Sequence, residues 1–280
     1  MTDSRVPLVG FGTYDINNEQ VELALDKALA VGYRFFDTAK VYGNEKEIGN
    51  ALEKLFPKHN LSREDVWIAT KVYPNADQEI VRKDIEESLE SLKTNYIDLY
   101  LIHYPKPKAT DPNDLEANRA ARIATYQTLL KFRDEKKIRH VGVSNYEVRH
   151  LQELQENGLE WPRCNQIELH PHFIRTGIRQ FCNEKGISIQ AFRSLAKHDE
   201  GIFNSPIVTK LAAQYGVPKT TIVLSWATSQ GVAVIPKSMN ESRMRENLQT
   251  IQLDENEIAE LSKLNCSRNY VKRATGWDVL

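Results

Sequence analysis

Four residues with complementary chemistry stand at or just beyond the ends of short apolar runs: Asp37, Tyr42, Lys71 and His103. A tyrosine is a poor acid at neutral pH because its reference pKa is about 10. A nearby lysine ammonium stabilises the phenolate and lowers that pKa, and an aspartate beside the lysine keeps it charged and in place. A histidine can hydrogen-bond a substrate oxygen. Together these side chains predict a proton donor directed at a polarised carbonyl group.

These residues meet only if the fold brings the ends of several strands together. Short apolar or β-branched runs predict eight strands, at residues 8–12, 34–37, 66–71, 98–103, 140–144, 165–169, 187–192 and 233–236. Apolar residues at helical spacing predict helices over 19–30, 44–55, 78–92, 118–135, 146–157, 176–184, 206–215, 241–249 and 255–264. This alternation indicates a parallel sheet with helical crossovers.

The length of 280 residues allows either one closed barrel, which takes about 250 residues, or two smaller α/β domains. Eight strand–helix units and the lack of a Ser-, Gly- or Pro-rich linker favour a single (β/α)8 TIM barrel over residues 1–280, with a parallel eight-stranded sheet. Chemistry in such a barrel lies at the carboxyl ends of the strands. Two irregular stretches, 105–115 and the tail 266–280, are expected to border the site, the tail beside the substrate pocket.

Charge, hydropathy and cysteine spacing do not favour several classes of protein. Lys plus Arg number 37 and Asp plus Glu 38, a net charge of −1 that does not support a polybasic nucleic-acid or membrane binder. Mean hydropathy is −0.51, and no apolar run of about 18 residues predicts a transmembrane helix. The first residues do not resemble a signal peptide, and Cys164, Cys182 and Cys266 are widely spaced without a CxxC motif. We expect a reduced, cytoplasmic protein.

Longer segments carry a clear resemblance. The run GFGTYDINNEQVELALDKALAVGYRFFDTAKVYGNEKEIGNAL is similar to the signature of the aldo-keto reductase family, and IDLYLIHYP, VGVSNY, NQIELHP and IPKSMNESRMREN match further family segments in order. The resemblance spans residues 8–264 and implies a (β/α)8 barrel that transfers hydride between a nicotinamide and a carbonyl. The family's catalytic Asp, Tyr, Lys and His fall on Asp37, Tyr42, Lys71 and His103.

The resemblance also implies where the cofactor binds. The run GFGTYD lacks the third glycine of a dinucleotide fingerprint, so it is interpreted as a barrel strand and its loop. The nicotinamide carboxamide is expected to be held by Ser144, Asn145 and Gln166, whose side chains donate and accept hydrogen bonds. Family members stack an aromatic ring on the nicotinamide, commonly in a Tyr-Ser-Pro-Leu-Gly run. Here Phe192 supplies the ring, and the run FRSLA departs from that pattern.

Residues after the eighth predicted strand match the family's segment for the adenosine phosphate: Lys237, Ser238, Arg243, Glu246 and Asn247. Lys237 and Arg243 offer cations for the 2′-phosphate that distinguishes NADP(H) from NAD(H). Asn240 is expected to cap the helix that follows, which directs free N–H groups at an anion. The resemblance therefore predicts NADP(H) as the cofactor.

The substrate opening is expected to be bordered by residues that follow the first four strands and by the tail: Tyr14, Val41, Tyr73, Tyr104 and Trp277. This predicts an aromatic-walled pocket for aldehydes or ketones. Several family members have tryptophan where the chain has Tyr14, Tyr73 and Tyr104, so a less apolar pocket is expected.

Two other interpretations remain open at this stage. Some family relatives serve as cofactor-binding regulatory or structural proteins, because a fold does not guarantee turnover. An unrelated barrel enzyme would need a different pair of acid and base groups. His170 and His172 form an H-x-H pair without a third spaced ligand, so no metal site is predicted. The family default is a monomer.

Overall fold

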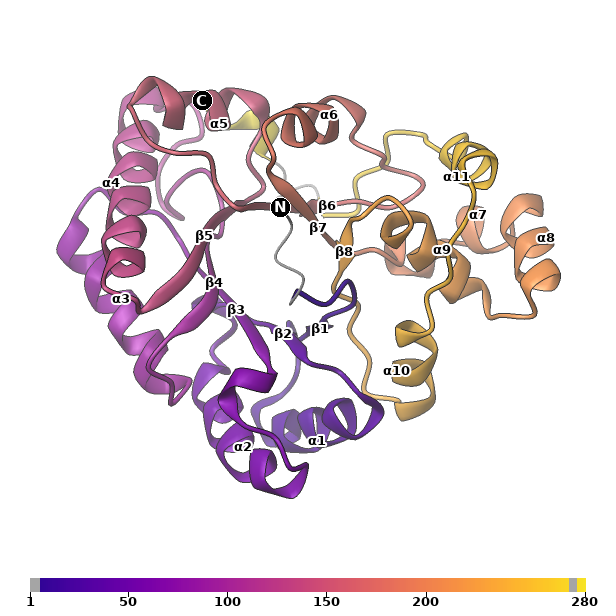
Figure 1. Ribbon diagram of the computed structural model, residues 1–280. Helices are drawn as coiled ribbons and strands as arrows, with labels where there is room; N and C mark the ends of the chain where they lie inside the picture. The colour runs from indigo at the N-terminus through magenta and orange to yellow at the C-terminus, as the bar shows by residue number, and fades with distance from the viewer. Residues whose placement is uncertain (1–5, 272–275) are drawn as a thin grey trace.

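The computed structural model describes residues 6–271 and 276–280, and within them it contains a sheet of eight parallel strands. The strands follow one another in chain order: β1 (Phe11–Gly12), β2 (Phe35–Asp37), β3 (Trp67–Val72), β4 (Ile97–Ile102), β5 (Ile138–Ser144), β6 (Cys164–Glu168), β7 (Ser188–Phe192) and β8 (Ala233–Val234). Val234 N donates to Leu8 O and Gly10 N to Val234 O, both at 2.8 Å, which joins β8 to the segment before β1. The predicted (β/α)8 barrel is confirmed, and Figure 1 looks along it with the helices outside.

The described helices cover the outer face of this barrel (Figure 1). They are α1 (Val21–Val31), α2 (Glu45–Lys58), α3 (Gln78–Ser91), α4 (Leu115–Asp134), α5 (Val148–Glu156), α6 (Thr176–Glu184), α7 (Glu200–Phe203), α8 (Pro206–Tyr215), α9 (Lys219–Thr228), α10 (Glu241–Leu248) and α11 (Glu255–Ser262). None of the helices within the described ranges is long and apolar enough to cross a membrane.

Helix α9 is the main element that the sequence pattern did not predict. Every residue from 221 to 228 is buried, so the helix lacks the polar stripe that marks an amphipathic surface helix. Helix α4 begins at Leu115 rather than 118, because the Asp114 carboxylate caps it by accepting from Ala117 N at 3.0 Å. Strands β1 and β8 contain two residues each, fewer than predicted.

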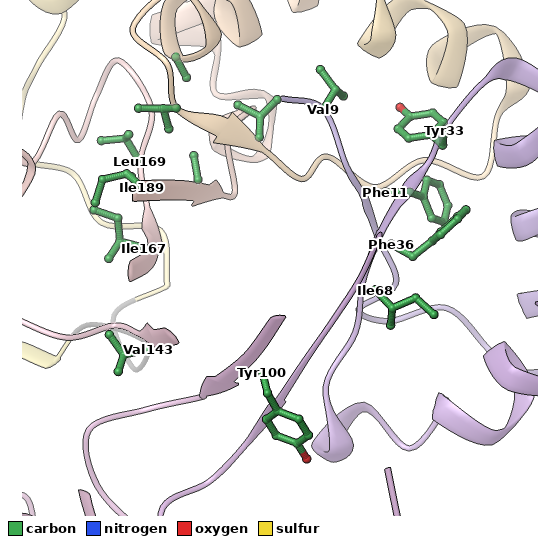
Figure 2. Packing of buried hydrophobic residues seen from close by; sticks show 14 of the residues in the cluster. Val9, Phe11, Tyr33, Phe36, Ile68, Tyr100, Val143, Ile167, Leu169 and Ile189 are labelled. Atoms are coloured by element: carbon green, nitrogen blue, oxygen red, sulfur yellow. The ribbon is translucent and has the colours of Figure 1, made fainter. Parts of the chain in front are cut away.

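Two apolar layers hold the strands in place. The larger lies between strands and helices, and Figure 2 shows Phe11, Phe36 and Tyr100 within it. The second layer contains residues of the opposite strand faces, including Phe35, Trp67, Leu99 and Leu101. Because successive strand residues point to opposite faces, strands buried on both faces have continuous apolar sequences. The carboxyl ends of these strands therefore stand on a rigid base.

Candidate active site

Asp37, Tyr42, Lys71 and His103 lie together at the carboxyl ends of β2, β3 and β4. Asp37 ends β2, Lys71 is in β3, His103 follows β4, and Tyr42 ends the 3-10 turn Lys40–Tyr42 beyond β2. Lys71 Nζ lies 2.6 Å from Asp37 Oδ1 and 3.5 Å from the Tyr42 hydroxyl. It also donates to Thr38 O at 2.8 Å. The lysine is thus held between a carboxylate and a phenol.

The charges of this cluster depend strongly on burial. Burial disfavours the Lys71 ammonium, but the attraction of Asp37 and the contact with Tyr42 outweigh it and raise the lysine pKa. Burial also raises the pKa of Tyr42, and Lys71 only partly opposes that change. The expectation of a lowered tyrosine pKa is therefore wrong for this structure, because the cost of a buried phenolate exceeds the attraction of the lysine. Tyr42 is protonated at neutral pH, as a proton donor must be.

His103 presents a neutral imidazole to the same cluster. Its ring centroid lies 5.8 Å from that of Tyr42 and 5.1 Å from that of Tyr73. Burial, then the charges of Lys71 and Lys108, lower its pKa to about 3. Nδ1 is buried and forms no hydrogen bond within the described residues. An imidazole that stays neutral retains one N–H to offer to a substrate oxygen.

The three residues expected to hold the nicotinamide carboxamide are adjacent to this cluster. Ser144 ends β5, and its hydroxyl donates to Gln166 O at 2.9 Å. Asn145 has a left-handed backbone with a φ of 64°, and its Nδ2 donates to His103 O at 2.9 Å. Gln166 Nε2 donates to Asp37 Oδ2 at 2.8 Å and to Gln190 Oε1 at 3.1 Å. A hydrogen-bonded chain thus connects β5, β6 and β7 to Asp37.

Gln190 takes part in this series of hydrogen bonds, although the sequence did not single it out as a candidate site residue. It is buried in the middle of β7, and a polar residue inside an apolar strand was the signal available for it.

The free hydrogen-bond acceptors of Asn145 and Gln166 fit an amide ligand. Within the described residues, Asn145 Oδ1 and Gln166 Oε1 accept no hydrogen bond, whereas both side-chain NH2 groups are engaged. Two acceptors near the strand ends suit the N–H donors of a carboxamide. Phe192 is half-buried at the end of β7, the strand that pairs with β6, and it offers an apolar ring. The residues therefore fit the nicotinamide end of a dinucleotide.

The segment expected at the adenosine phosphate surrounds the start of α10. Asn240 caps the helix as predicted, since its Oδ1 accepts from Arg243 N at 3.1 Å. Lys237 Nζ donates to Asp15 O at 2.9 Å. The exposed Arg243 guanidinium has no carboxylate partner within the described residues, which leaves it available for an anion.

The three remaining residues of this segment differ in their exposure. Ser238 Oγ accepts from Asn240 N at 3.1 Å, and Glu246 accepts from Ser242 Oγ at 3.2 Å. Asn247 is buried and its side chain faces Tyr33. The first two lie near the surface at α10, whereas Asn247 ties that helix to the barrel.

Comparisons with known proteins identify the family of the chain. A sequence model of the aldo/keto reductase family matches residues 8–265. The chain belongs to the aldo-keto reductase family. It is 35% identical over 266 residues to methylglyoxal reductase DkgA of Yersinia pestis, an alignment that covers 94% of this chain and 90% of that protein.

Two further relatives agree with this family. D/L-glyceraldehyde reductase of Hypocrea jecorina is 33% identical, over 94% of this chain and 86% of that one. The solved structure of aldose reductase from Schistosoma japonicum superposes with a TM-score of 0.84 and 30% identity, covering 95% of this chain and 90% of that one. The protein is an oxidoreductase that reduces aldehydes or ketones, and the interpretation as an unrelated barrel enzyme is wrong.

Aromatic side chains lie next to the tetrad of this aldo-keto reductase. The Tyr14 ring lies 5.1 Å from the Tyr42 ring, and Tyr73 lies against His103. Val41 is exposed beside Tyr42. Burial and the charge of Asp278 raise the pKa of the half-exposed Tyr104 to about 12. The side chain of Trp277 lies outside the described part of the chain.

The two irregular stretches meet each other. Leu280 N donates to Pro112 O at 2.9 Å. The fully buried Arg122 donates to Leu280 O at 3.0 Å and to Pro105 O at 2.9 Å. The described end of the tail is therefore docked on the stretch 105–115, next to Tyr104.

The run after Phe192 differs in backbone as well as in sequence. Arg193 has a φ of 53°, and its guanidinium carbon lies 5.8 Å from the centre of the Tyr14 ring. Arg193 therefore reaches across from β7 towards the residues that follow β1.

The H-x-H pair has structural partners. His170 Nε2 lies 3.0 Å from Glu168 Oε1, and His172 Nδ1 lies 3.0 Å from the Tyr270 hydroxyl. No group of three or more His, Cys, Asp or Glu side chains suited to a metal ion occurs in the described residues.

Proposed function

We propose that the protein reduces small aldehydes and ketones to alcohols with NADPH, with Tyr42 as the proton donor. The observation that carries the proposal is the buried ammonium of Lys71, placed between the Asp37 carboxylate at 2.6 Å and the Tyr42 hydroxyl at 3.5 Å. A phenol paired with a fixed cation can release its proton to a substrate oxygen, because the cation stabilises the phenolate that remains.

Each residue of the tetrad then has a defined task. Tyr42 donates its proton to the carbonyl oxygen as that oxygen becomes negative. Lys71 stabilises the resulting phenolate, and Asp37 holds Lys71 charged and in position. His103, neutral at physiological pH, offers an N–H to the same oxygen and orients it. When bound, NADPH supplies the hydride, and Ser144, Asn145, Gln166 and Phe192 would hold its nicotinamide ring.

The preference for NADPH over NADH rests on α10. Arg243 offers a fork of donors without a carboxylate partner in the described residues, and Lys237 lies at the same corner. The 2′-phosphate of NADPH is the group that such cations bind, and NADH lacks it. Glu246, Ser238 and Asn247 would complete the contacts at this end.

The substrate proposal is restricted to small carbonyl compounds. Tyr14, Tyr73, Tyr104 and Val41 would wall the pocket. Relatives named methylglyoxal reductase and glyceraldehyde reductase act on compounds of that size. We extend the proposal to a cytoplasmic monomer; the free thiols of Cys164, Cys182 and Cys266 support a reducing compartment.

The test is the loss of NADPH absorbance in the near ultraviolet with a panel of neutral aldehydes, α-dicarbonyls and ketones. We expect turnover with several aldehydes, and a much lower kcat/KM for cofactor when NADH replaces NADPH. Turnover with NADH alone would overturn the cofactor proposal. Lack of turnover with every member of the panel, from protein that binds NADPH in a fluorescence titration, would overturn the proposed function.

A further inference from the structure

One lysine beside the tetrad has no role in the mechanism above. Lys108 lies in the stretch that follows β4, and its Nζ stands 5.0 Å from the centre of the Tyr73 ring. The Tyr73 ring lies 5.1 Å from the His103 ring. A single aromatic ring therefore separates this ammonium from the imidazole that faces the substrate oxygen.

The loop that carries Lys108 is held in shape by its neighbour. Lys106 Nζ donates to Thr110 O at 2.6 Å, to Pro107 O at 2.9 Å and to the carbonyl of Lys108 at 3.3 Å. Lys106 is thus engaged within the loop and fixes the backbone at Lys108. The docked C-terminal residue supports the same loop, because Leu280 N donates to Pro112 O.

The ammonium of Lys108 is not neutralised by a side chain. Within the described residues it forms no ion pair or hydrogen bond, and its side chain is exposed to solvent. The charges of Asp278 and Glu147 act on the neighbouring Tyr104, and Glu147 is paired with Arg175 at 2.5 Å. Lys71 and Asp37 neutralise each other inside the site. The Lys108 ammonium on the Tyr73 ring therefore stands without an ion-pair partner in the described part of the chain.

A cation on an aromatic ring beside the reacting centre is suited to a specific kind of substrate. The ring holds the ammonium near its face without consuming its N–H donors, so these remain available to an anion. We propose that Lys108 makes this reductase selective for aldehydes that carry a carboxylate several bonds from the carbonyl carbon. The carbonyl oxygen would lie at Tyr42 and His103, and the carboxylate at the Lys108 ammonium. The inference rests on the proposed function and adds its substrate class.

The electrostatic reach of Lys108 supports this placement. Its charge is one of the causes, after burial and Lys71, that lower the pKa of His103. A charge that acts on the imidazole also acts on a substrate bound there. A carboxylate held against Lys108 is only partly desolvated, so we expect a contribution of about 5- to 50-fold in kcat/KM.

The experiment compares matched aldehydes that differ only in charge: para-carboxybenzaldehyde with para-tolualdehyde, and succinic semialdehyde with butanal. We expect the wild-type enzyme with NADPH to prefer each carboxylated member. In Lys108→Met this preference should fall about 5- to 50-fold, mainly through a higher KM, while kcat/KM for the neutral aldehydes stays constant. Lys108→Arg should keep the preference, and added salt should weaken it in the wild type.

Lys210→Met is the matched control, because Lys210 is an exposed lysine on α8 and the variant makes the same change in net charge. Its preference should equal that of the wild type. An equal change for charged and neutral aldehydes in Lys108→Met would show that the lysine only supports the loop and would overturn the inference. So would a wild type without a preference. If no aldehyde is reduced at all, the proposed function itself fails.

Discussion

Strand β4 carries an important polar residue at each of its ends, and the two surroundings differ. At the amino end, Asp98 is fully buried, and its carboxylate binds Arg63 and Arg139, each at 2.7 Å. It also accepts from Ile68 N at 2.9 Å. The two guanidinium carbons lie 4.2 and 3.9 Å from the centre of the Tyr96 ring. Every oxygen and cation in this group has a partner.

At the carboxyl end, His103 stands in a cluster that is incompletely satisfied. Nδ1 of His103 is buried without a hydrogen bond in the described residues, and Lys71 reaches Tyr42 only at 3.5 Å. Asn145 Oδ1 and Gln166 Oε1 also accept nothing there. These atoms are left free to bind a ligand, and the buried Nδ1 of His103 costs free energy as long as it has no partner. The Asp98 group has a structural role, whereas the tetrad has groups that are free to bind substrate.

Lys71→Met has the largest expected effect, because it acts on both catalysis and stability. The Asp37 carboxylate would stay buried without its cation, which costs about 3–5 kcal/mol of unfolding free energy. Reduction should nearly cease. The Tyr42 pKa should rise further because its one stabilising cation is lost, so any residual rate should persist to more alkaline pH. Urea unfolding and a pH–rate profile test both. A normal rate with an unchanged profile would show that Lys71 is only structural.

Tyr42→Phe separates the two effects. The proton donor is lost and the ring is kept, so kcat should fall by about 10²–10⁴ while NADPH affinity and unfolding free energy change little. Single-turnover kinetics and a fluorescence titration with NADPH provide the measurements. A kcat near that of the wild type would contradict the assignment of Tyr42 as the acid.

Asp98→Asn tests the other end of β4. Removal of the charge leaves Arg63 and Arg139 without their shared carboxylate, and we expect a loss of about 2–4 kcal/mol in unfolding free energy. The kcat and KM of the folded enzyme should be unchanged. Urea denaturation followed by circular dichroism measures the first, and steady-state kinetics the second. A large fall in kcat would mean that the two ends of β4 are coupled and that the Asp98 group is not purely structural.

Arg243→Ala removes a cation that lacks a carboxylate partner in the described residues. A charge-assisted hydrogen bond contributes about 1.5–3 kcal/mol, so NADPH should bind roughly 10- to 150-fold more weakly. NADH has no 2′-phosphate, and its affinity should change much less. The measurement is the dissociation constant of NADPH and of NADH for the wild type and for Arg243→Ala, obtained by titration. Equal losses would show that Arg243 supports the loop and does not bind phosphate.

The smallest expected effect is that of pH on kcat/KM, which we expect not to change as the solution becomes mildly acidic. Burial, Lys71 and Lys108 lower the pKa of His103 to about 3. A histidine of ordinary pKa would gain its proton near pH 6.5 and change the rate there. We therefore expect kcat/KM for a neutral aldehyde to stay level from about pH 7 to about pH 5. An acid limb near pH 6.5 that disappears in His103→Gln would contradict the neutral imidazole.

Parts of this protein followed from local sequence. Eight apolar runs predicted the strands, the residues at their ends predicted the tetrad, and Asn240 predicted its own helix cap. These features depend on periodicity and on residues close in the chain, which sequence displays directly. Helix α9 was not predicted from the sequence, because complete burial removes the polar stripe by which an amphipathic helix is recognised.

Other properties depended on the tertiary structure, because they arise between residues distant in the chain. Residue types alone indicated a lowered Tyr42 pKa, whereas burial reverses the direction. Gln166 was a candidate for the cofactor, but only the closed barrel shows that it also binds Asp37, 129 positions away. The contact of Lys108 with Tyr73 was equally hidden. Sequence determined which groups stand at the strand ends; packing decided how far each is desolvated and which charges face it, and these two quantities set its chemistry.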